Sequence, residues 1–191
     1  MAFRTVVVDP PWPMRRFNGW GSARELPYRP MSLDGIRALP IPGVVGKEGY
    51  LFLWTPDAFL DAAVSIISAW GFTRRQTVVW TKDGVPRMGL GGMFATSVEF
   101  CLVAQKIRPG TNAHGSRTMG VRAPASHFAW PLREHSEKPA EFYILLETLS
   151  PGPYLDVFAR VRRPGWVAVG DAIDGQEAAI SLRSLSAGCP T

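Results

Sequence analysis

The sequence has little cysteine. Only Cys101 and Cys189 occur among 191 residues, and there is no CxxC pair. Disulfide-stapled scaffolds and zinc sites need several cysteines at characteristic spacings, so neither is indicated. The three histidines show no ligand spacing either, and we expect no metal. So little cysteine fits a reducing compartment, and the expected location is cytoplasmic.

Long apolar runs are also missing. No stretch approaches the roughly 18 to 20 unbroken apolar residues of a membrane span, so we expect no membrane contact. Charged residues make up only 19% of the chain and hydrophobic residues 46%, which argues against global disorder and provides a sizeable core. We expect one catalytic domain over residues 1–175, followed by a loose tail over residues 176–191.

Negative charge is in deficit. The chain has 21 lysines and arginines against 16 acidic residues, which gives a formal net charge of +5. This balance favours a polyanionic partner such as nucleic acid, although a solvated basic surface would explain the same count. The basic residues bunch at Arg15 and Arg16, at Arg74 and Arg75, and at Arg160, Arg162 and Arg163.

Short β-rich runs alternate with helical runs along the chain. We predict strands over residues 5–9, 50–55, 76–82, 98–106, 154–160 and 165–171, and helices over residues 33–40, 56–71 and 138–150. This alternation is typical of an α/β fold, a mostly parallel sheet with helices on both faces. No helix separates the third and fourth strands, so we predict that they form an antiparallel hairpin at the sheet edge. Residues 13–29 and 107–134 lack periodicity, and such long loops are typically functional or disordered.

The stretch "VVVDPPW", Val6 to Trp12, ends a β-branched run with an acid, two prolines and a tryptophan. Ligands of an open α/β sheet lie outside the carboxyl ends of its strands, where we expect Asp9. The ionised Asp9 carboxylate and the Pro10 carbonyl only accept hydrogen bonds, and Pro10 and Pro11 fix the turn. Trp12 adds a flat face for stacking. This set suits a flat ring with an exocyclic NH2 group, such as an adenine flipped out of a helix.

The motif also carries a resemblance. The chain resembles the adenine-N6 methyltransferases that include the catalytic subunit of the messenger-RNA writer and its bacterial and phage DNA relatives. The resemblance covers about residues 5–173, most of the chain. It implies a circularly permuted, Rossmann-like fold and S-adenosylmethionine as cofactor. The motifs that carry it occur in this order: "DPPW", "LPYRPMS", "YLFLWT", "VVWTK", "EFCLVA", "HSEKPAEFY", "ETLSPGPYLDVFAR" and "PGWVAVGD".

The same resemblance implies a set of site residues. In the family, the Asp-Pro-Pro-aromatic motif binds the nitrogen that is methylated. The catalytic residues would be Asp9, Pro10, Pro11 and Trp12. The cofactor contacts would be Asp9, Lys138, Phe158, Arg160, Arg162 and Asp171. The substrate contacts would be Trp12, Tyr28, Glu99 and Lys138, with Tyr28 in a mobile loop over the base.

Several of these residues also have ordinary structural explanations. Lys138 could be a solvated lysine at a helix start, and Glu99 could be a polar residue that merely marks the start of a strand. Trp54 and Trp80 end two neighbouring strands and could line the pocket, but buried tryptophans are more often core.

The sequence departs from the family pattern in three places. Family members commonly carry a segment before the first strand that contacts the cofactor's adenine, whereas only eight residues precede Asp9 here. Family members often have Asn at the position of Asp171. Arg162 follows a strand where the family has arginine-polar clusters, so it could contact the cofactor ribose or be a surface charge.

These features predict an enzyme that moves the methyl group of S-adenosylmethionine to the N6 amino group of adenine in nucleic acid. DNA is favoured over RNA because a compact catalytic domain of this kind looks bacterial or phage-like. Recognition would come from the irregular segments, a basic surface, a second copy of the chain or a partner subunit. The alternatives are a catalytically silent nucleic-acid-binding subunit, and a methyltransferase acting on cytosine N4 or on protein glutamine.

Overall fold

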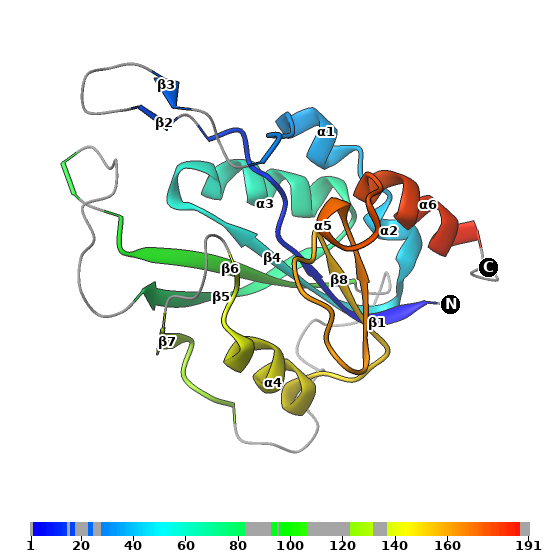
Figure 1. Cartoon of the computed structure of the whole chain (residues 1–191). Helices are drawn as coiled ribbons and strands as arrows, with labels where there is room; N and C mark the ends of the chain where they lie inside the picture. The colour runs from blue at the N-terminus through cyan, green and yellow to red at the C-terminus, as the bar shows by residue number, and fades with distance from the viewer. Residues whose placement is uncertain are drawn as a thin grey trace.

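The computed structural model describes residues 2–14, 16–17, 23–24, 28–82, 93–94, 96–106, 123–131 and 137–187. The strands are β1 Phe3–Val8, β2 Arg16–Phe17, β3 Ala23–Arg24, β4 Val45–Thr55, β5 Thr73–Lys82, β6 Val98–Gln105, β7 His127–Trp130, β8 Tyr154–Val157 and β9 Trp166–Val169 (Figure 1). The helices are α1 Leu33–Arg37, α2 Ile41–Val44, the 3-10 turn η1 Asp57–Phe59, α3 Leu60–Ala69, α4 Ala140–Leu149, α5 Asp171–Asp174 and α6 Ala178–Ala187.

Seven strands form one sheet in the order β7-β5-β6-β4-β1-β8-β9. The central strand β1 pairs in parallel with β4 and with β8, and β8 pairs in parallel with β9. The predicted α/β fold with a mostly parallel sheet is therefore confirmed. The strands that follow β1 along the chain lie on one side of it, and the last two lie on the other. The carboxyl end of β1 is thus a point where the winding of the sheet reverses, which is where such folds bind ligands.

The predicted antiparallel hairpin exists, but it is not at the sheet edge. β6 runs antiparallel to β5 on one side and to β4 on the other. The edge belongs instead to β7, which pairs in parallel with β5. The prediction missed β7 because this strand has only four residues and lies within a segment that lacks an apolar period.

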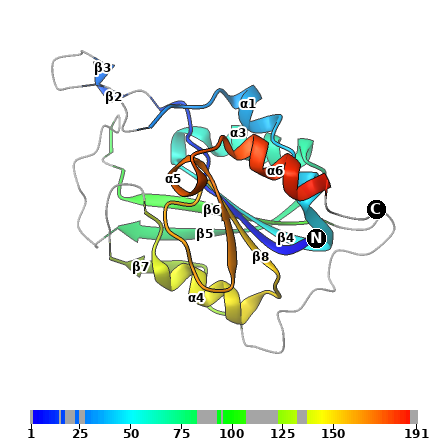
Figure 2. The same cartoon turned by 45° about the vertical axis from the view of Figure 1, so that its right-hand side comes forward.

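Helices cover both faces of the sheet, as predicted. In β4, Leu51 and Leu53 face one buried cluster, and Phe52 and Trp54 face the other. Helices α1, α2, α3 and α6 cover the first face, and α4 covers the second (Figure 1, Figure 2). Because both faces are packed, the sheet presents its carboxyl edge as the natural place for a ligand.

The last two strands end earlier than predicted. β8 ends at Val157 because Phe158 adopts a φ of 64°, which breaks the strand. β9 ends at Val169, and Gly170 has a φ of 145° that favours glycine. A Cβ on Gly170 would lie 3.0 Å from the Phe158 Cα, so the two turns approach closely at the carboxyl edge.

The C-terminal segment differs from the predicted loose tail. Helix α6 covers most of it, and Ala178, Ser181 and Leu182 are buried. Ala178 and Leu182 belong to the core cluster on the first face, where α6 lies beside α2 (Figure 1). The segment is small and polar in composition. Even so, the spacing of Ala178, Ser181 and Leu182 places them on one face of α6, and this face packs on the core.

Much of the two irregular segments lies outside the described residues. In the first, the structure describes a two-stranded ribbon of β2 and β3; Arg15 is not described. In the second it describes β7. Among the helices of the described ranges, none combines the length and apolar character needed to cross a bilayer.

Candidate functional site

The turn after β1 is fixed from several directions. The Asp9 N–H donates to the Val157 carbonyl at 3.2 Å, which ties the turn to the end of β8. The Trp12 N–H donates to the Pro10 carbonyl at 2.8 Å, and the Met31 N–H donates to the Pro11 carbonyl at 2.8 Å. The Pro10 oxygen keeps a second lone pair for another donor. The predicted pair of acceptors at this strand end is therefore present on a constrained turn.

Trp12 does not offer the predicted open face. Its ring stacks on Phe59 at a centroid distance of 5.3 Å, and only 3% of the residue is exposed. Its indole N–H donates to the Trp54 carbonyl at 2.9 Å. The tryptophan thus anchors the turn to β4 and η1 instead of supporting a base, because its surroundings bury it.

Four side chains of alternating charge meet at the carboxyl edge. The Lys138 ammonium lies 2.7 Å from Asp9 Oδ2 and 3.2 Å from Glu99 Oε2. The other oxygen of Glu99 pairs with the ammonium of Lys82. Asp9 follows β1, Lys82 ends β5, Glu99 is the second residue of β6, and Lys138 precedes α4. Residues from four separate parts of the chain therefore form one ionic cluster, and Lys138 is no solvated helix-end lysine.

Burial and pairing act on the pKa values in opposite directions. Burial raises the pKa of Asp9, although the ammonium of Lys138 acts to lower it. Burial also raises the pKa of Glu99, but Lys138 and Lys82 outweigh it and lower the value to about 2. Burial lowers the pKa of Lys138, whereas Asp9 and Glu99 raise it overall. Lys138 and Glu99 are therefore charged at neutral pH.

The two tryptophans at the strand ends are core residues that support this cluster. Trp54 and Trp80 are almost fully buried and their rings meet edge to face, with centroids 6.0 Å apart. The ammonium of Lys138 lies 5.4 Å from the Trp54 ring centroid, and that of Lys82 lies 5.5 Å from the Trp80 centroid. Both distances allow a cation–π attraction between each ammonium and the neighbouring tryptophan ring.

A small pocket opens beside the cluster, toward the end of β8. Side chains of both charges line it, among them Asp9, Lys138, Asp156, Phe158, Arg160 and Arg163. The structure thus brings together Asp9, Lys138, Phe158 and Arg160 of the predicted cofactor residues. Arg160 also acts to lower the pKa of Asp9.

Arg162 and Asp171 are placed differently from the prediction. The Arg162 guanidinium donates to the Ile173 carbonyl at 3.1 Å, so it ties the turn after β8 to α5. Asp171 does not end a strand, because it is the first residue of α5 and is exposed. Neither residue is among those lining the pocket.

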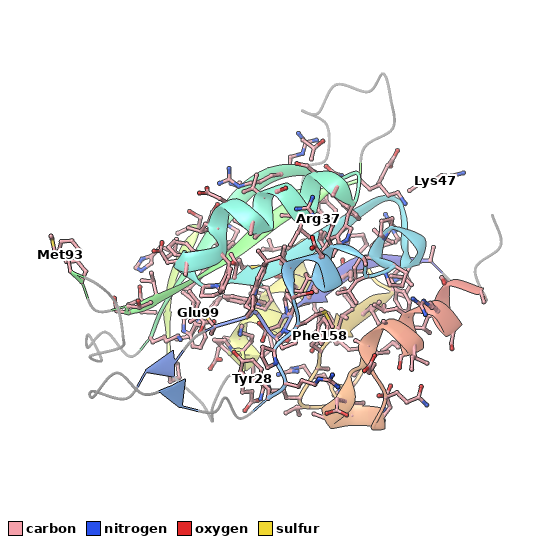
Figure 3. The ribbon with its side chains drawn as sticks, turned by 90° about the horizontal axis from the view of Figure 1, so that it is seen from above. Tyr28, Arg37, Lys47, Met93, Glu99 and Phe158 are labelled. Carbon is pink, nitrogen blue, oxygen red and sulfur yellow. The ribbon has the colours of Figure 1, made fainter. Side chains whose placement is uncertain are left out.

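The remaining two predicted substrate residues lie on the same side of the molecule. Figure 3 labels Tyr28, Glu99 and Phe158 around one region, far from Lys47 at the start of β4. Tyr28 is half-buried in a bend just before Met31. The Met31 N–H donates a hydrogen bond to the Pro11 carbonyl. The Tyr28 segment is therefore tied to the same turn as Asp9.

The sequence analysis missed a second buried cluster, centred on Asp156. Burial raises the pKa of Asp156 to about 7, although the Tyr143 hydroxyl donates to its carboxylate and Arg163 lies nearby. The Arg163 guanidinium stacks 3.7 Å from the Tyr143 ring centroid and lies 3.5 Å from Asp156 Oδ2. A signal was present in the sequence, since an acid between Leu155 and Val157 interrupts a buried strand.

No metal centre is formed within the described ranges, where no group of three or more His, Cys, Asp or Glu side chains could hold an ion. What the site offers is mixed charge beside a constrained acceptor pair. Such an arrangement can bind a zwitterion and orient an amino group, but it provides no Ser or Cys nucleophile among the residues described above.

Comparison with known proteins places this geometry in a family. A sequence model of the MT-A70 family matches residues 3–172, which include the Asp9 turn, the ionic cluster and the pocket. The chain belongs to the MT-A70 family. The resemblance that rested on "DPPW" and the ordered motifs is thereby confirmed. MT-A70 methyltransferases use S-adenosylmethionine as the methyl donor.

Several curated proteins are similar to this MT-A70 chain. It is 30% identical over 181 residues to the N(6)-adenosine-methyltransferase subunit METTL3 of Danio rerio, across 91% of this chain and 28% of that protein. It is 31% identical over 181 residues to the N(6)-adenosine-methyltransferase MT-A70-like protein of Drosophila melanogaster, across 91% and 27%. It is 29% identical over 189 residues to the N6-methyladenosine RNA methyltransferase MTA1 of Pyricularia oryzae, across 90% and 47%. The chain therefore spans between about a quarter and a half of the length of these relatives.

Proposed function

We propose that this MT-A70 chain transfers a methyl group to the N6 amino group of adenine in a nucleic acid. The observation that carries the proposal is the position of Asp9. It ends the central strand, on a turn with the Pro10 carbonyl, directly beside a pocket of mixed charge. The relatives named above support the reaction, because their names describe N6-adenosine methylation.

The residues of the pocket fit S-adenosylmethionine. The amino-acid end of this cofactor carries an ammonium and a carboxylate, and the pocket is lined by acids and by the guanidinium groups of Arg160 and Arg163. We propose that the two arginines hold the carboxylate and that Asp156 holds the ammonium. When bound, the cofactor supplies an electrophilic methyl group on a sulfonium.

Asp9 and Pro10 orient the amino group of the target. Adenine N6 is a poor nucleophile because its lone pair is delocalised into the ring. Two fixed acceptors favour a pyramidal nitrogen and stabilise the positive charge that develops on it as the nitrogen–carbon bond forms. A fixed approach of the amino group adds a proximity effect of several kcal/mol. As the nitrogen–carbon bond forms, the sulfur–methyl bond would break and leave a neutral thioether, and the N6 proton would pass to solvent afterwards.

The polymer is a separate part of the proposal. The sequence analysis favoured DNA, but this preference has no support among the relatives. The Pyricularia oryzae relative is named as an RNA methyltransferase. We therefore propose RNA as the substrate and keep DNA as the competing outcome. The cytoplasmic location, the homodimer and the partner subunit considered above stay predictions.

The test is methyl transfer from radiolabelled S-adenosylmethionine to matched adenine-containing pools of RNA and DNA, single- and double-stranded. We expect label in N6-methyladenosine in an RNA pool, and none with Asp9→Ala. The control is Asp61→Ala, because Asp61 is an exposed carboxylate on α3. Label in the DNA pools alone would overturn the choice of polymer. Cofactor binding without transfer to any pool would favour the silent-subunit alternative, and label in cytosine or glutamine would favour the other amino methyltransferases.

A further inference from the structure

Lys82 occupies a position in the ionic cluster that the proposed reaction does not explain. It is the last residue of β5, and its backbone N–H donates to the Ser97 carbonyl at 3.0 Å. Trp80 of the same strand pairs in register with Glu99 on β6. This register brings the Lys82 ammonium to the oxygen of Glu99 that does not face Lys138. Glu99 is therefore held between two lysines.

The cluster contains a competition for Asp9. Under the proposed function, the Asp9 carboxylate must accept a hydrogen bond from the target amino group. Its Oδ2 atom already accepts from Lys138 at 2.7 Å. Lys138 also lies 3.2 Å from Glu99, and an ammonium has three donors, so Glu99 offers an alternative acceptor for the same cation. How firmly Glu99 attracts Lys138 then decides how available Asp9 is.

We propose that Lys82 is a positioning residue for methyl transfer: it orients Glu99 and keeps it ionised against Lys138, so that Asp9 is released to the target amino group. The role rests on the proposed function. Lys82 touches neither Asp9 nor the pocket residues described above, and acts through Glu99 alone. The Trp80 ring, 5.5 Å from the ammonium, restricts where Lys82 can lie.

Electrostatics gives this role a measurable signature. The charged groups that act on Glu99 are Lys138 and Lys82, and burial opposes both. Those that act on Asp9 are Lys138, Glu99 and Arg160. Without Lys82, burial and one remaining lysine act on Glu99, so its pKa rises. Once protonated, Glu99 attracts Lys138 less, and Lys138 stays with Asp9.

The experiment compares wild type, Lys82→Met, Lys82→Gln and Lys82→Arg, with Lys47→Met as the control. Lys47 is exposed at the start of β4, far from the site (Figure 3). The kcat and KM for the nucleic-acid substrate are measured from pH 4 to pH 9, together with the Kd for S-adenosylmethionine. We expect the acidic limb of the kcat/KM profile to lie at higher pH in Lys82→Met and Lys82→Gln than in wild type. Lys82→Arg should restore the wild-type profile, and the cofactor Kd should change less than twofold.

The possible failures are distinguishable. An unshifted profile in both neutral variants, with an active wild type, overturns the role of Lys82 and leaves the proposed function standing. A uniform loss of kcat at every pH, not rescued by Lys82→Arg, shows a merely structural role and also overturns the proposal. A wild type that transfers no methyl group to any pool refutes the proposed function, and the positioning role falls with it.

Discussion

At the scale of single residues, the site depends on buried acids kept in defined charge states. Asp9 and Asp156 both have raised pKa values because of burial, yet their partners differ. The Asp9 carboxylate is paired with the Lys138 ammonium at 2.7 Å. The Asp156 carboxylate accepts from the Tyr143 hydroxyl and lies 3.5 Å from the Arg163 guanidinium. The closer cation favours the charged form of Asp9, and the weaker partners leave Asp156 able to take a proton near neutral pH.

Asp156 should give the stability of the fold a pH dependence. Its folded pKa of about 7 lies above the ordinary value of 3.8, so between these pH values the folded protein holds a proton that the unfolded chain has lost. This contribution is full below about pH 4 and is lost as the pH rises to 7, by up to about 4 kcal/mol. Urea unfolding from pH 4 to pH 8 should show that decline in wild type and much less of it in Asp156→Asn. Asp61→Asn, at an exposed position, is the control and should behave like wild type. If the free energy of unfolding declined with pH equally in wild type and in Asp156→Asn, the raised pKa of Asp156 would be contradicted.

At the scale of elements, the carboxyl edge depends on close contacts between turns. Gly170 meets the Phe158 Cα at a distance that leaves no room for a side chain, and its φ of 145° is disfavoured for other residues. Gly170→Ala should therefore lower the free energy of unfolding by about 1 to 3 kcal/mol and weaken cofactor binding. Calorimetry measures both the free energy of unfolding and the binding of the cofactor, and so checks the two expectations. Gly175→Ala is the matched control because its φ of 66° is also positive but open space surrounds it. A similar loss of cofactor affinity in both variants would contradict the expected role of the turn contact.

Helix α6 should contribute substantially to stability. Leu182 is fully buried in the core cluster beneath α6, while Ile180 on the same helix is 50% exposed. Leu182→Ala should cost about 2 to 5 kcal/mol of the free energy of unfolding, and Ile180→Ala much less. The midpoints of chemical denaturation of the two variants decide whether α6 is a packed helix or the loose tail expected from the sequence. Equal midpoints would support the loose tail.

The elements show which kinds of information the sequence carries. Short apolar runs predicted the strands β1, β4, β5 and β6, because burial on both faces demands such runs. The β-branched run before Asp9 placed that acid correctly at a strand end. The sequence could not reveal that Phe59 covers the Trp12 ring, since the contact joins residues 47 positions apart, from 12 to 59. For the same reason, the pairing of Asp9, Lys138 and Glu99 is visible only in the folded chain, where three distant parts of the sequence meet.

At the scale of the whole molecule, the positive charge of the residues that the structure describes is not gathered on one face. Arg74 and Arg75 lie at the start of β5, at the edge opposite the carboxyl ends of β1 and β8. Arg160 and Arg163 line the pocket, and Arg162 is used to hold α5. The net charge therefore predicts attraction to a polyanion in general, while the cations near Asp9 belong to the candidate site.

RNA binding should depend on salt and on where charge is removed. We expect the affinity for a single-stranded RNA to fall at least about tenfold between 50 and 200 mM salt, as counterion release requires. The double variant Arg74→Gln, Arg75→Gln should keep most of the wild-type affinity, because this pair lies away from the site. Fluorescence anisotropy titrations over a salt series measure both effects. An abolished affinity in the double variant would show that nucleic acid uses the opposite edge.

The central claim is that Asp9 orients an adenine amino group for methylation. The most direct measurement is mass spectrometry of nucleosides from RNA incubated with S-adenosylmethionine and either wild type or Asp9→Asn, a variant of the same shape. The account predicts N6-methyladenosine with wild type and a loss of at least about 100-fold with Asp9→Asn, at unchanged thermal stability or above it. Near-native turnover by a folded Asp9→Asn variant would contradict the account.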